Sequence, residues 1–258
     1  MPQLTQDGKY VAFGDLNPHK VFLYSTENPE EPVAVYQKRG HLNRAEEVRR
    51  FQDRYLLTNA TAMLWAIPVD RSPAQCLYAD PARTGNDSRI NGYIKSIDTW
   101  ENEIIISHRY LEHNEDPWPI NQVIHLELQD GEWQKREVRM PHYVQKVRFD
   151  RHGGLCVFIE PFHGASRHYS AIPDDFDDDH QEMKLAKGYN YELSNDGEFC
   201  SVQVFDDGWY AVLYRTKTWE EIFRTNRKDE VASQTFSIHN QWWLLSGKRD
   251  YMLSLNDL

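Results

Sequence analysis

The stretch NDGEFCSV, from Asn195 to Val202, places an Asp-Gly pair directly before a run rich in aromatic and β-branched residues. A tight hairpin turn needs a positive φ, which glycine adopts without strain and which Asp and Asn tolerate. Aromatic and β-branched residues after such a turn favour a strand. The stretch QDGKYVAF, from Gln6 to Phe13, repeats the pattern near the N-terminus. Each copy therefore predicts a β-hairpin.

Weaker copies of the turn-and-strand pattern recur along the chain. They are FQDRYLLT (Phe51 to Thr58), TWENEIII (Thr99 to Ile106), RHGGLCVF (Arg151 to Phe158) and HNQWWLL (His239 to Leu245). The first strand residues after the six turns are Tyr10, Tyr55, Ile104, Leu155, Phe199 and Trp242, so the spacing is 43 to 51 residues. This period is typical of four-stranded propeller blades.

The period predicts an all-β chain that forms a single β-propeller domain over residues 1–258, with six blades of four antiparallel strands. The approximate repeats are 1–38, 46–79, 92–139, 142–186, 189–226 and 231–258. After Trp242 only 16 residues remain. We therefore expect the last blade to be incomplete, with three strands.

The Asp-Gly copies QDGKYVAF and NDGEFCSV resemble the turn of TolB-type and related tryptophan–aspartate-like propeller repeats, in which Asp-Gly-Lys precedes an aromatic residue. The resemblance covers most of the chain as a repeat. It implies a fold used mainly as a binding platform, which constrains function weakly.

The composition excludes several classes of function. The 29 Lys and Arg against 40 Asp and Glu give a net charge of -11, which repels a phosphate backbone and attracts a cationic partner. The N-terminal MPQLTQDGKY lacks the pattern of a signal peptide, and no apolar run is long enough for a membrane helix. The 3 Cys show no paired spacing. We expect a cytoplasmic monomer without a cofactor, and no binding to nucleic acid or membrane.

Long loops mark one face of the predicted propeller as the candidate binding surface. Loops from second to third strands and connections between blades share this loop-rich face, which includes the segment SHRYLEHNEDPWPIN, Ser107 to Asn121. Long loops with Arg, His and aromatic side chains are typical of protein-binding sites. The predicted partner-binding residues are His108, Arg109, Tyr110, His113, Trp118, Arg83, Arg89, His41, Arg44, Phe162 and His163.

Catalytic motifs are weak by comparison. The loops carry a set of residue types that suit zinc, iron or manganese: His108, Glu112, His113, Asp116, His163 and His168. Their spacing does not match HExxH, and GASRH around Ser166 lacks the nucleophile elbow GxSxG. We assign no catalytic and no metal-binding residue.

The acidic stretch DDFDDDH, Asp174 to His180, holds five carboxylates in seven residues. Laid on the calcium-loop template, it has His180 where glycine is required and Ala186 where the final Glu is required. The repeat places it between the third and fourth strands of the fourth blade. It is predicted to be a solvated turn at the perimeter, with docking of a basic partner as the alternative.

Other conspicuous side chains have structural interpretations. Cys156 and Cys200 occupy equivalent places in neighbouring repeats, which indicates small buried side chains. The pairs Trp209-Tyr210 and Trp242-Trp243 occupy strand positions, where aromatic residues favour packing in the core.

These observations predict a non-catalytic, acidic, protein-binding propeller that engages a basic protein partner through its loop-rich face. One role that fits is an immunity-type inhibitor of a cationic toxin or nuclease, because charge complementarity speeds encounter and selects partners. The alternative is a propeller hydrolase of lactonase-like type with a metal in the central channel. A third interpretation, small-ligand or glycan binding through exposed Trp and Tyr, has no motif behind it.

Overall fold

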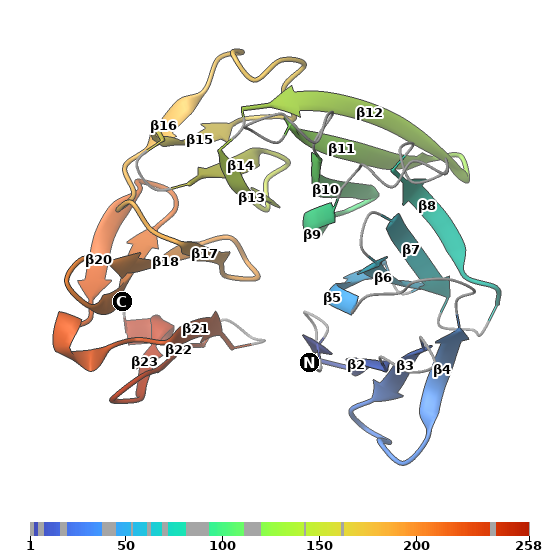
Figure 1. The fold of residues 1–258 in the computed structure, drawn as a ribbon, viewed down its shortest axis with the longest axis horizontal. Coiled ribbons are helices and arrows are strands. Elements are labelled where there is room, and N and C mark those ends of the chain that lie inside the picture. Colours follow the sequence, from blue (N-terminus) through green and yellow to red (C-terminus); the bar gives the residue numbers. More distant parts are fainter. Residues whose placement is uncertain are drawn as a thin grey trace. The chain divides into compact units, whose positions relative to one another are not determined.

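A computed structural model describes residues 3–4, 8–15, 20–37, 45–52, 54–60, 63–68, 72–80, 93–110, 120–141, 143–160, 163–237 and 241–257. The chain forms two compact units, an N-terminal unit (Met1–His142) and a C-terminal unit (Tyr143–Leu258). Both units consist of antiparallel sheets whose strands pair in chain order (Figure 1). No helix among the described residues is long and apolar enough to cross a membrane.

The N-terminal unit contains three four-stranded sheets. The first sheet comprises β1 (Gln3–Leu4), β2 (Tyr10–Asp15), β3 (Lys20–Ser25) and β4 (Pro32–Gln37). The second comprises β5 (Ala45–Phe51), β6 (Tyr55–Ala60), β7 (Met63–Pro68) and β8 (Gln75–Ala79). The third comprises β9 (Tyr93–Trp100), β10 (Glu103–Tyr110), β11 (Ile120–Gln129) and β12 (Glu132–Met140).

The C-terminal unit contains two four-stranded sheets and a three-stranded one. The first comprises β13 (Val144–Phe149), β14 (Leu155–Ile159), β15 (Ser166–Tyr169) and β16 (Gln181–Met183). The second comprises β17 (Asn190–Leu193), β18 (Phe199–Phe205), β19 (Trp209–Arg215) and β20 (Glu220–Arg224). The third comprises β21 (Ser233–Phe236), β22 (Trp242–Ser246) and β23 (Tyr251–Ser254), with short 3-10 helices η2 (Arg227–Asp229) and η3 (Leu255–Asp257) on either side.

The all-β prediction is confirmed, but the number of blades needs correction. The described residues form five complete four-stranded blades rather than six. The C-terminal sheet, which the sequence analysis counted as an incomplete sixth blade, has three strands because β23 leads into helix η3 and not into a fourth strand.

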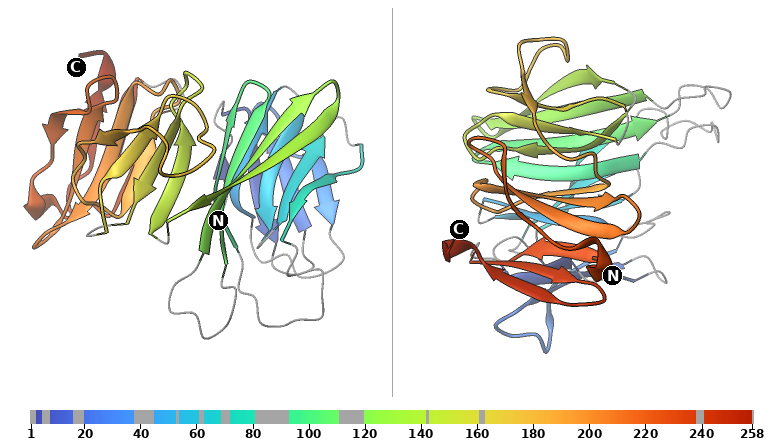
Figure 2. Two further views of the ribbon diagram at one scale, coloured as in Figure 1. Left: turned by 90° about the horizontal axis from the view of Figure 1, so that it is seen from above. Right: turned by 90° about the vertical axis from the view of Figure 1, so that its left-hand side faces the viewer.

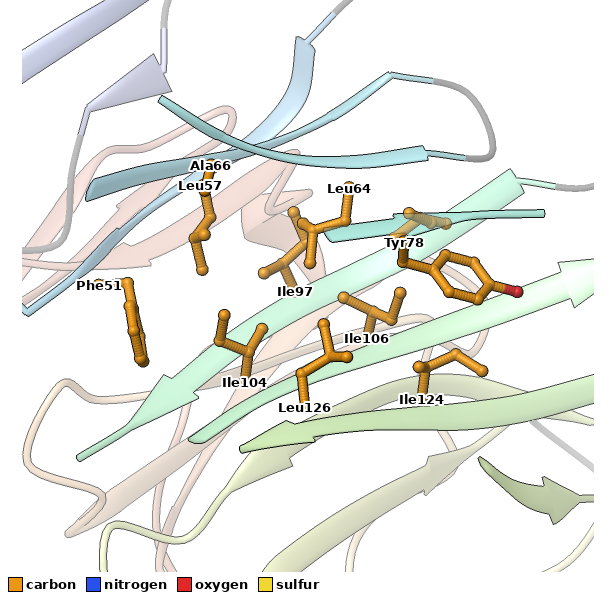
Figure 3. Packing of buried hydrophobic residues seen from close by; sticks show 11 residues of the cluster. Phe51, Leu57, Leu64, Ala66, Tyr78, Ile97, Ile104, Ile106, Ile124 and Leu126 are labelled. Carbon is orange, nitrogen blue, oxygen red and sulfur yellow. The ribbon is translucent and has the colours of Figure 1, made fainter. Parts of the chain in front are cut away.

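Both faces of a sheet can be buried. In β10, Ile104, Ile105 and Ile106 are all 0% exposed, although consecutive strand residues point to opposite faces. One face packs in a core cluster that joins the sheets β5–β8 and β9–β12 (Figure 3). The labelled members of this cluster are Phe51, Leu57, Leu64, Ala66, Tyr78, Ile97, Ile104, Ile106, Ile124 and Leu126. The sheets therefore depend on one another for burial of their apolar side chains.

The C-terminal unit is built in the same way, with its sheets side by side (Figure 2). Cys156 and Cys200 are buried in the cluster between the sheets β13–β16 and β17–β20, so the prediction that they are structural is confirmed. Trp243 and Tyr210 are buried as expected. Trp242 and Trp209 are exceptions. Trp242 lies on the opposite face of β22 and is 37% exposed, and Trp209 is only partly buried.

The Asp-Gly turn of NDGEFCSV has the geometry that its sequence predicts. Gly197 has φ of +76°, and a Cβ added there would lie 2.5 Å from the backbone oxygen of Asp150 in the preceding sheet. The side chain of Asp196 accepts hydrogen bonds from the hydroxyl of Ser194 (2.5 Å) and the backbone N–H of Glu198 (3.0 Å). Glycine is thus required both by the turn and by the close approach of the neighbouring turn.

Asp150 organises that neighbouring turn. Its Oδ1 accepts hydrogen bonds from the backbone N–H groups of His152 (2.7 Å) and Gly154 (2.8 Å), and its Oδ2 lies 2.7 Å from Nε2 of His168. Burial raises the pKa of Asp150, but the hydrogen bonds from His168 and the two backbone groups outweigh burial, so the pKa is lower than its ordinary value. The carboxylate form is therefore the one that the fold stabilises.

We expect replacement of a buried apolar side chain to destabilise the fold far more than replacement of an exposed one. Leu213 is 0% exposed in the core that joins β19 to the last sheet, whereas Met252 of β23 is 64% exposed. Leu213→Ala should lower the free energy of unfolding by about 2 to 5 kcal/mol, and Met252→Ala should change it by less than about 0.5 kcal/mol. Urea denaturation followed by tryptophan fluorescence measures both, and equal effects would contradict the packing described above.

Asp150 should make stability depend on pH in acid. Because the pKa of Asp150 is lower in the folded state than in the unfolded chain, the carboxylate contributes stability above about pH 4. That contribution is lost as the pH falls through the folded-state value. The difference in urea midpoint between the parent protein and Asp150→Asn should therefore shrink between pH 5 and pH 2, values chosen to span the ordinary pKa of about 3.9. A difference that stays constant over this range would show that the charge of Asp150 is not involved.

Candidate protein-binding surface

The described residues include four of the predicted partner-binding residues: His108, Arg109, Tyr110 and His163. The other seven lie outside the described residues: His41, Arg44, Arg83, Arg89, His113, Trp118 and Phe162. Their part in binding stays a prediction.

The predicted loop from Ser107 to Asn121 is shorter than expected. Strand β10 continues to Tyr110 and β11 begins at Ile120, with Ser107 opposite Val123 and Tyr110 opposite Ile120 in the ladder. Polar residues such as His108 are accommodated in the strand because they find partners in neighbouring strands. The loop boundary predicted from polarity alone was wrong by about four residues at its start.

His108 is held inside the N-terminal unit and is 1% exposed. Its Nδ1 lies 3.2 Å from the hydroxyl of Tyr78 and 3.2 Å from Nε2 of Gln122, and its Nε2 lies 3.2 Å from Oδ2 of Asp80. Burial, together with the nearby charge of Asp80, raises the pKa of Tyr78, so this phenol stays neutral. The ring of Tyr110 stacks on His108 with centroids 5.4 Å apart. Arg109 and Tyr110, both partly exposed, are the accessible residues here.

The C-terminal unit has two ends with different chemistry. We call the end that carries the β14–β15 and β18–β19 loops and the connections between sheets the loop end, and the opposite end the turn end. The hydroxyl of Tyr191 accepts a hydrogen bond from Gly188 N–H (3.1 Å) and donates one to the backbone oxygen of Ile159 (3.4 Å), which joins the loop ends of adjacent sheets. The loop end corresponds to the loop-rich face of the sequence analysis.

An exposed aromatic cluster lies at the loop end of the sheet β17–β20. It consists of Tyr189, Phe205 and Trp209, which we call the aromatic cluster. The centroids of the Phe205 and Trp209 rings are 5.0 Å apart, and those of Tyr189 and Trp209 are 5.7 Å apart in an edge-to-face arrangement. Phe205 is 51% exposed and Tyr189 is 45% exposed. A cluster of large apolar side chains that are exposed to solvent is typical of an interaction surface.

The backbone fixes the position of each ring of the aromatic cluster. Phe205 and Trp209 face each other across the β18–β19 ladder, and the N–H of Tyr189 donates to the backbone oxygen of Gln203 (2.8 Å). The intervening turn uses positive φ values at Asp207 (53°) and Gly208 (141°). The rings therefore stand on rigid strand ends and not on a long loop.

Charged residues border the aromatic cluster. Asp206 and Asp207 are exposed in the β18–β19 turn, and Arg227 pairs with Asp206 at 2.5 Å. The guanidinium of Arg227 also lies 5.5 Å from the centroid of the buried Tyr210 ring. The aromatic cluster is thus an apolar centre with a polar rim, the usual arrangement of a protein–protein contact.

His163 lies at the same end in the preceding sheet. Its ring stacks on Tyr143 with centroids 3.9 Å apart and an interplanar angle of 2°, and the residue is exposed. This position agrees with the loop-rich face chosen from the sequence, and contact of His163 with a partner stays a prediction.

The acidic stretch Asp174 to His180 connects β15 to β16 at the turn end, as predicted. Its five carboxylates are exposed, while Phe176 is 7% exposed and anchors the turn beneath the guanidinium of Arg167. The backbone oxygen of Phe176 accepts a hydrogen bond of 2.6 Å from the hydroxyl of Tyr169. The prediction of a solvated turn at the perimeter of the sheet is confirmed.

Among the residues that the structure describes, no three or more His, Cys, Asp or Glu residues lie closely enough together to hold a metal ion. Of the metal-type residues noted in the sequence, Glu112, His113 and Asp116 lie outside the described ranges.

Sequence reasoning missed the aromatic cluster. Phe205 ends β18 and Trp209 begins β19, with the three residues DDG between them. Two aromatic residues on either side of a three-residue turn must form a cross-strand pair at the strand ends, and this signal was available. The exposure of these two rings could not be predicted from the sequence, because it depends on how much of each ring the neighbouring elements cover.

Comparisons with known proteins identify the fold but not the function. No protein-family model matches the chain, and no curated protein matches it in sequence. Among solved structures, a chain of the crystal structure of the mitotic checkpoint complex has a TM-score of 0.62 at 7% identity, over 96% of this chain and 69% of that chain. The Pan2 WD40 domain of Neurospora crassa has a TM-score of 0.65 at 8% identity, over 99% and 75%. A luciferin-regenerating enzyme has a TM-score of 0.59 at 9% identity, over 95% and 82%.

WD40 repeats build β-propellers, each blade a four-stranded sheet. The likeness to the Pan2 WD40 domain spans nearly the whole chain, and the described sheets have the strand order of propeller blades. The resemblance to TolB-type repeats in particular stays a prediction. Since the similar structures include both an enzyme and a chain of a protein complex, fold alone does not decide function. The chain is an all-β protein with the β-propeller fold.

Proposed function

We propose that this chain is a non-catalytic protein-binding propeller that engages a basic protein partner through the loop end of its C-terminal unit. The observation that carries the proposal is the aromatic cluster of Tyr189, Phe205 and Trp209. Aromatic side chains bring large contact area at low cost in conformational entropy, and they dominate the energy of many protein interfaces. Their exposed area is removed from water when a partner binds.

The basic character of the partner follows from charge. The net charge of the chain is -11, and Asp206 and Asp207 lie directly beside the aromatic cluster. A Lys or Arg side chain of a partner can stack on an aromatic ring and pair with one of these carboxylates. Long-range attraction between the acidic chain and a cationic partner speeds their encounter.

The proposed surface includes His163 of the C-terminal unit, which was chosen from the sequence at the loop-rich face. Arg109 and Tyr110 of the N-terminal unit are separate candidates for contact with a partner. A specific role that combines an acidic field with a rigid platform is that of an immunity-type inhibitor, which covers the active face of a cationic toxin or nuclease. We further propose that the chain acts as a cytoplasmic monomer.

The alternative from the sequence, a lactonase-like hydrolase with a metal in the central channel, is not proposed. Within the described ranges, no metal-binding group of three or more ligands favours it. The likeness to a luciferin-regenerating enzyme at 9% identity concerns the fold alone.

Site-specific photo-crosslinking tests the proposed surface. A photoreactive phenylalanine analogue at Phe205 should capture a basic protein in cells of the native host, because Phe205, at 51% exposed, is the most exposed ring of the aromatic cluster. The same analogue at Met252, which is 64% exposed on β23, is the matched control and should capture none or far less of that protein.

The interaction should then be measured with the purified partner. Phe205→Ser is expected to weaken binding by at least about tenfold, as for an aromatic hot spot, while Met252→Ser leaves it unchanged. Raising the salt concentration should slow association, because the charges that steer the encounter are screened. A partner that binds the Phe205→Ser protein as tightly as the parent would overturn the proposal.

A further inference from the structure

Charged side chains gather at two places in the C-terminal unit. At the turn end lies a cavity of about 450 Å³ whose lining includes both signs of charge: Asp150, Glu198, Arg215 and Lys217. These charges balance, so they indicate no class of ligand. At the loop end, the β18–β19 turn beside the aromatic cluster carries two exposed carboxylates, those of Asp206 and Asp207, whose surroundings differ.

Asp206 is already paired with a cation of its own chain. Its Oδ2 lies 2.5 Å from Nη2 of Arg227, and both side chains are about half exposed. Arg227 is the first residue of η2, where the N–H of Asn226 donates to Oδ2 of Asp229 (3.0 Å) in a capping box. The start of η2 is therefore fixed, and Arg227 occupies Asp206 before any partner binds.

Asp207 has no such cation. Within the described part of the chain, its carboxylate forms no ion pair and no hydrogen bond. Its backbone has φ of +53°, in the left-handed region that Asp and Asn adopt more readily than most residues. The carboxylate of Asp207 is thus the acceptor of this turn that remains available to a partner.

The turn that carries Asp207 is held against η2. A Cβ added at Gly208, which has φ of +141°, would lie 3.0 Å from the backbone oxygen of Arg227, so the two segments approach closely. The N–H of Asp206 donates to the backbone oxygen of Gly208 (3.1 Å) and closes the turn. Asp207 is therefore attached to a well-fixed backbone.

We propose that Asp207 is the carboxylate that pairs with a cationic side chain of the partner at the aromatic cluster, and that Arg227 keeps Asp206 from doing so. The inference rests on the proposed function and states what the partner must offer, a lysine or arginine beside apolar surface. Such a cation can contact an aromatic ring and a carboxylate together. A second cation beside Asp206 would be repelled by Arg227.

A short peptide tests the inference without the natural partner. The peptide has one arginine between two glycines and is blocked at both ends, and it is titrated into isotope-labelled protein and followed by nuclear magnetic resonance. The amides of Asp207 and Gly208 and the indole of Trp209 should show saturable shifts. The same peptide with citrulline, which is uncharged and similar in shape, should give no saturable shift.

Two variants with the same change of net charge locate the contact. Asp207→Asn should raise the dissociation constant of the arginine peptide by about threefold or more, as for loss of one exposed charge pair. Asp179→Asn removes an exposed carboxylate at the turn end and should leave the constant unchanged. The proposal is overturned if the arginine peptide does not saturate, if the citrulline peptide binds as well, or if both variants weaken binding equally.

Arg227→Gln tests the competing cation. The dissociation constant of the arginine peptide should fall by about twofold or more, because Asp206 is then free to accept a cation. Lys217→Gln makes the same change of net charge at an exposed residue of the turn end and should have no effect. An unchanged constant for Arg227→Gln, or an equal fall for both variants, would refute the role of Arg227.

The outcomes distinguish this inference from the proposed function. If Phe205→Ser weakens binding of the natural partner while Asp207→Asn leaves peptide binding unchanged, the inference alone fails. If Asp207→Asn weakens peptide binding while Phe205→Ser leaves partner binding unchanged, the proposed function alone fails.

Discussion

The structure depends on one constraint: a sheet that has two apolar faces cannot cover either face by itself. In β18, six consecutive residues from Phe199 to Val204 are buried, although alternate side chains point to opposite faces. The sheets β13–β16 and β21–β23 cover these two faces within the C-terminal unit. Polar side chains join the sheets as well, since Gln203 donates to the backbone oxygen of Val231 (2.6 Å) and Lys146 pairs with Glu192 at 2.6 Å. Because the apolar faces of the sheets pack against one another, the unit offers function mainly at the ends of its strands.

The sequence predicts those parts of the fold that depend on residues close together in the chain. The Asp-Gly turn at Gly197 has the positive φ that its sequence requires, and the alternation of turns and strands marks every sheet. What the sequence could not provide depends on distant neighbours. His108 looks like a loop residue, yet it lies in a strand because Tyr78 and Asp80, from another sheet, supply its partners. The exposure of Phe205 and the cavity beside Lys217 likewise arise from packing between elements.

The two ends of the C-terminal unit carry different kinds of side chains. The loop end carries the aromatic cluster, whose rings are fixed by strand ends and by the bonded turn between them. The turn end carries the exposed acidic stretch Asp174 to His180 and a cavity whose lining includes both cations and carboxylates. Carboxylates in close succession repel one another and prefer water, so the acidic stretch stays solvated while Phe176 ties it to the sheet. The feature that looks most like a site in the sequence therefore has a structural explanation, and the aromatic cluster carries the case for binding.

Hydrogen–deuterium exchange of the complex with the captured partner tests the central claim most directly, because it reports protection along the whole chain. The account predicts slower exchange on binding in the segments that contain Tyr189 and Phe205 to Trp209, with no change in Asp174 to His180. Protection confined to the turn end, with the loop end unchanged, would contradict it.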